Sequence, residues 1–158
     1  MTKTRSIENL QTALKMELGA VHQYQLHAGV LDDWGMELLA SKMREEMREE
    51  IGHSDDYLSR ILFLKGSPRL VLEQPPVQAT TLNELFESDL KEEKAAIEFY
   101  SKAAREAADD GDLGTRVLFE RIALDEEEHM GWLELQLDLI ERMGEPAYIS
   151  KHVPGPTA

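Results

Sequence analysis

The sequence predicts an all-α fold: a four-helix bundle with one long crossover connection and a short fifth helix near the C-terminus. Apolar residues recur at steps of three and four along four long segments, which is the period of a helix face. Glycine and proline gather in the stretches between these segments, where they interrupt helices. A chain of 158 residues can bury a sizeable core, and we expect residues 1–158 to form a single domain.

The first two segments predict a pair of helices over residues 6–34 and 37–64. Ser6 is the expected N-cap of the first helix, and Gly35 marks its end. The link between the two helices is only a few residues long. They must therefore lie side by side in opposite directions.

The stretch from residue 65 to residue 80 contains one glycine and three prolines that exclude a helix. About sixteen residues at up to ~3.3 Å each span on the order of 50 Å, whereas a helix of about 27 residues is roughly 40 Å long. This stretch can therefore run the full length of the bundle. The third helix would then start at the same end as the second, which requires a single long crossover.

The third helix is predicted over residues 82–110. Thr81 and Glu84 have the spacing of a capping box, with Thr81 as N-cap and Glu84 reaching back. Gly111 supplies the turn that follows.

The fourth helix is predicted over residues 113–143, and Gly144 stands at the usual C-terminal stop. Residues 147–152 are expected to add the short fifth helix. The two prolines beyond it, Pro154 and Pro156, end helical structure.

A Glu-x-x-His pattern occurs twice, as Glu50 with His53 and as Glu126 with His129. On a helix, a separation of three residues puts both side chains on one face about one turn apart. Carboxylate and imidazole can then bind the same ion. Each copy is therefore a candidate half-site for a metal.

The two copies belong to a longer repeat with an offset of 76 residues. The same offset relates three further pairs, namely Glu17 with Glu93, Tyr24 with Tyr100, and Gly35 with Gly111. One helix pair therefore occurs twice. Four carboxylates and two imidazoles converging from four helices match the inward-projecting constellation of ferritin-like dinuclear carboxylate proteins.

Composition excludes several other classes of function. The net charge of −14 argues against nucleic acid and anionic membranes as partners and suits a protein that handles cations. The absence of cysteine excludes thiolate metal sites, disulfides and cysteine nucleophiles. The polar N-terminus has no apolar signal core, and no apolar run approaches membrane-spanning length, so we expect a cytoplasmic protein.

The predicted site has the charge and donor atoms of a dinuclear metal centre. Four carboxylates balance two divalent ions, whereas without metal they repel one another and resist burial. Oxygen and imidazole donors suit iron, manganese or zinc. One imidazole per metal leaves open positions for dioxygen or peroxide, which favours iron. Tyr24, Tyr57 and Trp132 lie one or two turns from these donors and are candidate catalytic residues that supply electrons.

Three stretches resemble the bacterioferritin family: Tyr57–Gly66, Ser88–Leu90 and Asp125–Glu134. The resemblance covers nearly the whole chain. It implies a ferritin-like bundle that acts as a ferroxidase, oxidising Fe(II) to Fe(III) with O2 or H2O2 for iron storage and detoxification. It also implies a homo-oligomeric shell of 24 subunits built from dimers.

The resemblance further implies a role for each donor. Glu50 and Glu126 would bridge two irons, Glu17 with His53 would complete one iron site, and Glu93 with His129 would complete the other. By the same resemblance, Tyr24, Tyr57 and Trp132 match the family's aromatic trio around the site.

One position departs from the family. Bacterioferritins bind haem through a methionine just after the bridging glutamate of the second helix, and here that residue is Ile51, which offers iron no ligand. Gln25, Arg44 and Arg48 add polar groups nearby. We therefore expect a haem-free homologue or a subunit that assembles with a haem-bearing partner. Met47, one turn away, is a disfavoured substitute ligand.

Two other readings stay open. A dinuclear manganese catalase or a rubrerythrin-like peroxidase would use the same bundle, although rubrerythrins usually add a four-cysteine iron domain and this sequence has no cysteine. A metal-free acidic helical adaptor would need none of this chemistry. His22, His27 and His152 fall off the metal-binding stripe and are expected to be surface or packing residues.

Overall fold

The computed structural model describes residues 3–155, and within that range it contains five helices and no strand. The helices are α1 (Thr4–Asp33), α2 (Glu37–Phe63), α3 (Leu82–Asp109), α4 (Leu113–Met143) and α5 (Glu145–Ser150). The predicted all-α bundle with a short C-terminal helix is therefore confirmed. The ends of the four long helices lie within two residues of the predicted ones.

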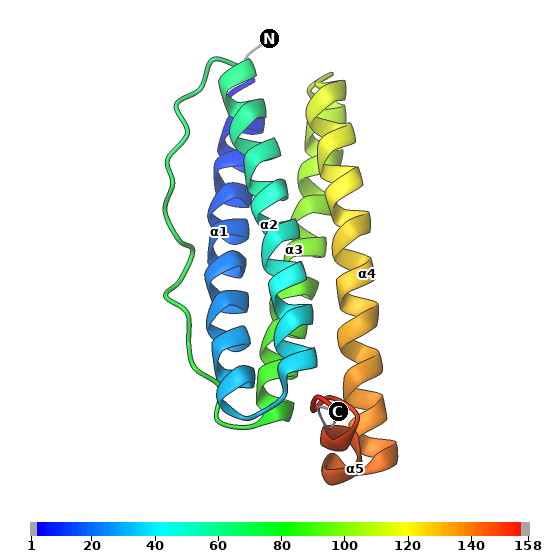
Figure 1. The fold of residues 1–158 in the computed structure, drawn as a ribbon. Coiled ribbons are helices and arrows are strands. Elements are labelled where there is room, and N and C mark those ends of the chain that lie inside the picture. Colours follow the sequence, from blue (N-terminus) through cyan, green and yellow to red (C-terminus); the bar gives the residue numbers. More distant parts are fainter. Residues whose placement is uncertain (1–2, 156–158) are drawn as a thin grey trace.

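The four long helices form two antiparallel pairs, α1 with α2 and α3 with α4 (Figure 1). The segment between α2 and α3 runs along the outside of α1 from one end of the bundle to the other, as its length predicts. Because of this crossover, α3 runs parallel to α2 (Figure 1). Helix α1 also packs against α3, α2 packs against α4, and α5 packs on the end of α4.

Side chains of α1 form hydrogen bonds with the backbone of the crossover and hold it against the helix. The side-chain amide of Gln11 both donates to and accepts from the backbone of Arg69, at 2.7 and 2.8 Å. Gln23 does the same with Val77, at 2.9 and 3.0 Å. Between these points the N–H of Glu73 donates to a carbonyl of α1. The extended segment therefore has backbone groups at three points along its length satisfied by α1, although it belongs to no sheet.

The predicted cap of α3 is present. The hydroxyl of Thr81 accepts from the N–H of Glu84 at 3.1 Å. The Glu84 carboxylate reaches back one residue further than a standard capping box, to the N–H of Thr80 at 3.0 Å. At the start of α4, Asp112 accepts from the N–H of Thr115 at 3.3 Å.

Two predicted helix starts are wrong. Helix α1 begins at Thr4 and its N-cap is Lys3, while Ser6 is buried inside the first turns, where packing overrides its preference for a cap. Helix α5 begins at Glu145, before the predicted residue 147. Gly144 turns the chain at a φ of 79°, and a proline fits the first helical turn without losing a hydrogen bond.

The core consists of two apolar clusters, one toward each end of the bundle. The cluster near α5 includes Leu31, Leu39, Phe86, Leu133 and Tyr148. The cluster at the opposite end includes Leu10, Leu14, Ile61, Phe119 and Ile122. Apart from His27, which lies among the residues of the cluster near α5, the buried acidic and histidine residues of the long helices fall between these two clusters. Within residues 3–155, no helix is long and apolar enough to cross a membrane.

Candidate metal centre

Six buried side chains from four helices meet between the two apolar clusters, and each is at most 6% exposed. One comes from α1, two from α2, one from α3 and two from α4: Glu17, Glu50, His53, Glu93, Glu126 and His129. The structure thus brings together all six residues that the sequence predicts as metal ligands. The six residues lie at the same height along the bundle because the 76-residue repeat puts corresponding ligands at corresponding positions of the two helix pairs.

The six residues form two overlapping sets of four. Glu17 and His53 join Glu50 and Glu126 in one set, and in the other set Glu93 and His129 join the same two glutamates. Within each set, one donor atom from every residue lies within 4.8 Å of the others. Two neighbouring ions that share two carboxylates need this arrangement.

Both imidazoles direct Nδ1 toward the carboxylates. His53 Nδ1 lies 2.9 Å from Glu126 and 3.6 Å from both Glu17 and Glu50. His129 Nδ1 lies 3.1 Å from Glu50 and 3.4 Å from Glu126. Each ring can therefore bind an ion through Nδ1 while Nε2 stays free for another contact.

The outward nitrogens are held by carboxylates that the sequence did not single out. His53 Nε2 lies 2.9 Å from Asp125. His129 Nε2 is hydrogen-bonded to the exposed Glu49 at 2.8 Å. It also lies 2.5 Å from the buried Glu46, which pairs with the ammonium of Lys42 at 2.7 Å. A carboxylate behind a ligating imidazole fixes its tautomer and its orientation. Only their helical position could have indicated these two carboxylates: Asp125 lies one turn before His129, and Glu46 lies one turn before Glu50.

Protons balance the buried carboxylates when no metal is bound. Burial opposes a charged imidazole, but the neighbouring carboxylates of Glu126 and Glu50 outweigh it and raise the pKa of His53 to about 11. The same competition raises the pKa of His129. Burial, together with the neighbouring Glu126, raises the pKa of Glu93 well above its ordinary value. These groups would exchange protons for metal charge on binding.

Two tyrosines donate hydrogen bonds to carboxylates of the site. The hydroxyl of Tyr24 donates to Glu93, and the hydroxyl of Tyr100 donates to Glu17 at 2.6 Å. Both rings are buried. Tyr24 was predicted to act at the site, whereas Tyr100 was recognised only as its partner in the repeat. That repeat was the signal that could have identified Tyr100.

The other two predicted aromatic residues have different surroundings. Tyr57 is fully buried, its ring centroid is 5.5 Å from that of Tyr100, and its hydroxyl has no hydrogen-bond partner among the described residues. Trp132 packs edge-on against Phe86 and under the ammonium of Lys42. Their roles as electron donors remain predictions.

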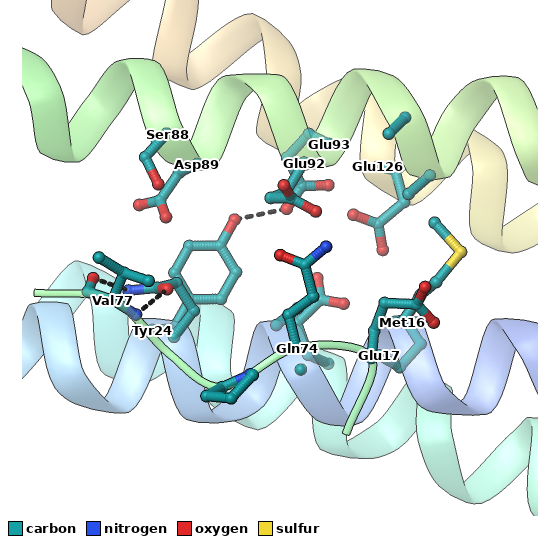
Figure 2. A pocket seen from close by; sticks show the side chains of 18 of the residues that line it. Met16, Glu17, Tyr24, Gln74, Val77, Ser88, Asp89, Glu92, Glu93 and Glu126 are labelled. Carbon is teal, nitrogen blue, oxygen red and sulfur yellow. Dashed lines mark hydrogen bonds between the residues drawn. The ribbon is translucent and has the colours of Figure 1, made fainter. Parts of the chain in front are cut away.

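A cavity of about 290 Å³ opens between α1, α3 and the crossover, and it reaches the site. Glu17, Glu50, Glu93 and Glu126 line its inner part together with the two tyrosines, while residues 73–75 line its outer part. Figure 2 shows Tyr24 and the carboxylates of Glu93 and Glu126 inside it. Small molecules and ions therefore have a polar space next to the candidate donors.

The remaining histidines have the expected kinds of position. His22 is exposed, and His152 packs on the ring of Tyr148. His27 is fully buried, with Nδ1 3.0 Å from Asp89. Asp89 also lines the cavity and was not predicted as a site residue, although it precedes Glu93 by one helical turn.

Comparison with known proteins agrees with this geometry. A family model described as a ferritin-like domain matches residues 7–143. The bacterioferritin of Brucella melitensis is 45% identical over 143 residues, covering 90% of this chain and 88% of its own. Mycobacterium tuberculosis bacterioferritin BfrA superposes with a TM-score of 0.93 at 34% identity, over 96% of this chain and 95% of its own.

Rhodobacter capsulatus bacterioferritin also has a TM-score of 0.93, at 37% identity, over 97% of this chain and 96% of its own. Its structure is described as having a metal-free dinuclear site and haem iron in a crystallographic special position. Matches of this extent, in sequence and in structure, establish the family. The chain belongs to the bacterioferritins, within the family of ferritin-like domains.

Proposed function

We propose that this chain is a ferroxidase subunit of an iron store, oxidising Fe(II) to Fe(III) with O2 or H2O2 at the buried site. The observation that carries the proposal is the pair of overlapping donor sets that share Glu50 and Glu126. Iron storage follows from membership of the bacterioferritins. The two shared glutamates would bridge two Fe(II) ions held by the remaining four donors.

The residues of the site supply charge balance and geometry for this reaction. Four carboxylates neutralise two Fe(II) ions, which would take the place of the protons that balance these carboxylates in the metal-free chain. Asp125 holds the ring of His53. Glu49, with Glu46 beside it, holds the ring of His129, and both contacts direct Nδ1 toward the ions. Two Fe(II) ions supply two electrons, which suffice to reduce H2O2 to water or O2 to H2O2.

The proposal is tested by loading anaerobic protein with Fe(II) and admitting air. We expect about two Fe(II) bound per chain and a fast oxidation phase. Replacing Glu17 or Glu126 by Ala should abolish that phase, because each removes a donor that the other residues cannot replace. Glu134→Ala, an exposed residue of α4, is the control and should leave the rate unchanged. A normal fast phase in the Glu17 and Glu126 variants would refute the proposal.

Three measurements separate the alternatives. A manganese catalase would contain manganese when purified and would release O2 from H2O2, and a rubrerythrin-like peroxidase would consume H2O2 with an external reductant. A metal-free adaptor would show no change in melting temperature on adding a chelator, whereas a site of clustered carboxylates should respond strongly. Native metal content, peroxide consumption and a melting curve with chelator therefore distinguish all four.

We expect the chain to bind no haem by itself. Ile51 stands where a haem-ligating methionine is expected, is 41% exposed on α2, and carries only hydrocarbon. Met47, the disfavoured substitute, packs against the apolar cluster near α5. Protein produced with excess haem should therefore show no stoichiometric Soret band. A stoichiometric band that disappears in Met47→Ala would overturn this expectation and would remove the need for a haem-bearing partner subunit.

A further inference from the structure

A buried carboxylate that belongs to neither donor set lies in the wall of the cavity. Asp89 is 3% exposed and lines the cavity together with the candidate donors (Figure 2). It precedes Glu93 by four residues, so the two lie about 6 Å apart along α3. The other described lining carboxylates outside the donor sets, Glu73 and Glu92, are exposed. Asp89 is therefore a buried acidic group beside the site but apart from it.

The hydrogen bonds behind Asp89 assign the proton of His27. Nδ1 of His27 lies 3.0 and 3.1 Å from the two oxygens of Asp89, and Nε2 lies 2.9 Å from the side-chain nitrogen of Gln23. The crossover fixes that amide, because its oxygen accepts from the N–H of Val77 and its nitrogen donates to the carbonyl of Val77. An amide nitrogen only donates, so Nε2 accepts and Nδ1 carries the proton.

This tautomer leaves a charged Asp89 without a cationic partner. His27 donates a hydrogen bond to it but is neutral, and a second proton on Nε2 would set two donors against each other. Within residues 3–155, no lysine or arginine pairs with Asp89. Burial raises the pKa of Asp89, because a charged carboxylate is costly to bury. A cation that enters the cavity would offset this cost.

We propose that Asp89 is a transit ligand for divalent cations, which pair with it in the cavity before they reach the donor sets. The proposal rests on the ferroxidase function proposed above and names a route by which Fe(II) reaches that site. A second observation points the same way. Oε2 of Glu93 is buried, has no hydrogen-bond partner among the described residues, and belongs to the next lining carboxylate along α3. An ion that leaves Asp89 therefore has an acceptor one helical turn further on.

The cavity as a whole favours cations. Its described lining residues include carboxylates at the mouth, in the wall and at the site, and none is lysine, arginine or histidine. A cleft lined by one sign of charge raises association rates by roughly ten- to a thousandfold. Solvent and salt screen the exposed carboxylates, and Glu73 already lies 3.8 Å from the ammonium of Lys15. Outside the donor sets, Asp89 should therefore contribute most.

Stopped-flow mixing of the metal-free full chain with Co(II) tests the proposal without any oxidation step. Absorbance gives the association rate, and a titration gives the affinity. Asp89→Asn keeps the size of the side chain and an oxygen that accepts from His27, but removes the charge. We expect association to slow on the order of tenfold while the affinity changes by less than about threefold, because Asp89 is not a final donor. Glu87→Gln, at an exposed position of α3 outside the cavity lining, is the control and should keep the wild-type rate.

Three outcomes have distinct meanings. An association rate in Asp89→Asn equal to that of the wild type would overturn the proposal. A loss of affinity as large as the loss of rate would overturn it as well, because Asp89 would then hold the ion at rest. A wild type that binds no Co(II) would instead refute the metal site on which the ferroxidase function depends, so the two failures are distinguishable.

A charged adduct beside an intact Asp89 covers the case in which Asp89→Asn fails to fold. The chain has no cysteine, so Ser88→Cys places a single thiol in the cavity lining next to Asp89. Methanethiosulfonate reagents attach to it either an aminoethyl group, which is positively charged, or a propyl group of the same length without charge. The aminoethyl adduct should slow Co(II) association on the order of tenfold relative to the propyl adduct. Equal rates in the two adducts would contradict the role of Asp89.

Discussion

Each candidate imidazole ligand is held on both of its nitrogens. Nδ1 of His53 faces the shared glutamates, while Nε2 meets Asp125, which is about one-third exposed. Nε2 of His129 meets the buried Glu46. Because the outer carboxylate keeps the ring in one orientation and makes it a better donor, it contributes to metal affinity without touching the metal.

Asp125→Ala should therefore weaken metal binding with little effect on folding. We expect the affinity for Co(II) to fall on the order of 10- to 100-fold, because His53 loses the group that orients it. Glu128→Ala removes the same charge from an exposed position of the same helix and serves as the control. Optical titration with Co(II) measures both. Equal affinities in the two variants would show that Asp125 does not position the ring.

Glu93→Gln should separate the stability of the metal-free chain from its response to metal. Burial and Glu126 make a charged Glu93 costly, so in chelator the variant should melt no lower than the wild type. Metal at a hundredfold excess over its dissociation constant stabilises the wild type by about 2.7 kcal/mol, roughly 5 to 11 °C in melting temperature. Calorimetry should show most of this rise lost in the variant. A full rise would remove Glu93 from the ligand set.

The sequence predicts single residues well where the repeat constrains them. Glu17 and Glu93 are a full helix away from the Glu-x-x-His copies, and only the common offset connects them to the site. Asp125 and Glu46 could not be inferred in this way, because their contacts depend on how closely α2 approaches α4. The buried pair of His27 and Asp89 links α1 to α3 and depends on the same kind of approach.

At the scale of the elements, Asp112 joins two helix ends. It caps α4 through the N–H of Thr115, and the Arg60 guanidinium of α2 donates to it at 2.7 Å. Asp112 is 1% exposed. Burial opposes its charge, but hydrogen bonds from Thr115 and Arg60 outweigh burial and lower its pKa from 3.8 to about 2.

Asp112→Ala should lower the free energy of unfolding at neutral pH by about 2 kcal/mol. Because the folded pKa lies below the unfolded one, this stabilisation is complete above about pH 4 and disappears as the pH falls toward 2. The gap in melting temperature between wild type and variant should narrow over that range. The control is Asp109→Ala, an exposed position at the end of α3. A gap that is constant with pH would exclude the charged cap as its cause.

The helices and the crossover could be predicted because their signals are local. Apolar periodicity, the Thr81 cap and the glycine turns predict the elements, and the proline-rich stretch is long enough to permit the crossover that the structure contains. The start of α1 could not be predicted, because by sequence Ser6 is a better N-cap than Lys3, the actual one. The burial of Ser6 inside the helix, next to Asp112, is a tertiary effect.

At the scale of the whole molecule, several large apolar side chains remain exposed on a single chain. Leu70 and Val77 of the crossover are 65% and 72% exposed. Val71 and Leu72 extend this exposed apolar stretch, and we expect another protein to cover it. A second copy of the chain is the partner we expect, because this family's predicted shell is built from dimers.

The chain should therefore form a large homo-oligomer. Light scattering after size exclusion should give about twenty-four times the 18.0 kDa of one chain. The double variant Leu70→Glu and Val77→Glu should give a smaller particle, because charges would be buried in the contact. Ser67→Glu, an exposed polar position on the same crossover, is the control. A monomeric wild type would contradict the predicted shell. It would not contradict the metal site, because all six candidate ligands belong to one chain.

The central claim is that side chains from four helices hold two ions that share Glu50 and Glu126. Anomalous scattering from crystals soaked in Co(II) tests it most directly. We predict two peaks per chain, one among Glu17, His53 and the shared pair, the other among Glu93, His129 and the shared pair. A single peak, or peaks only at the outer carboxylates Glu46 and Asp125, would contradict it.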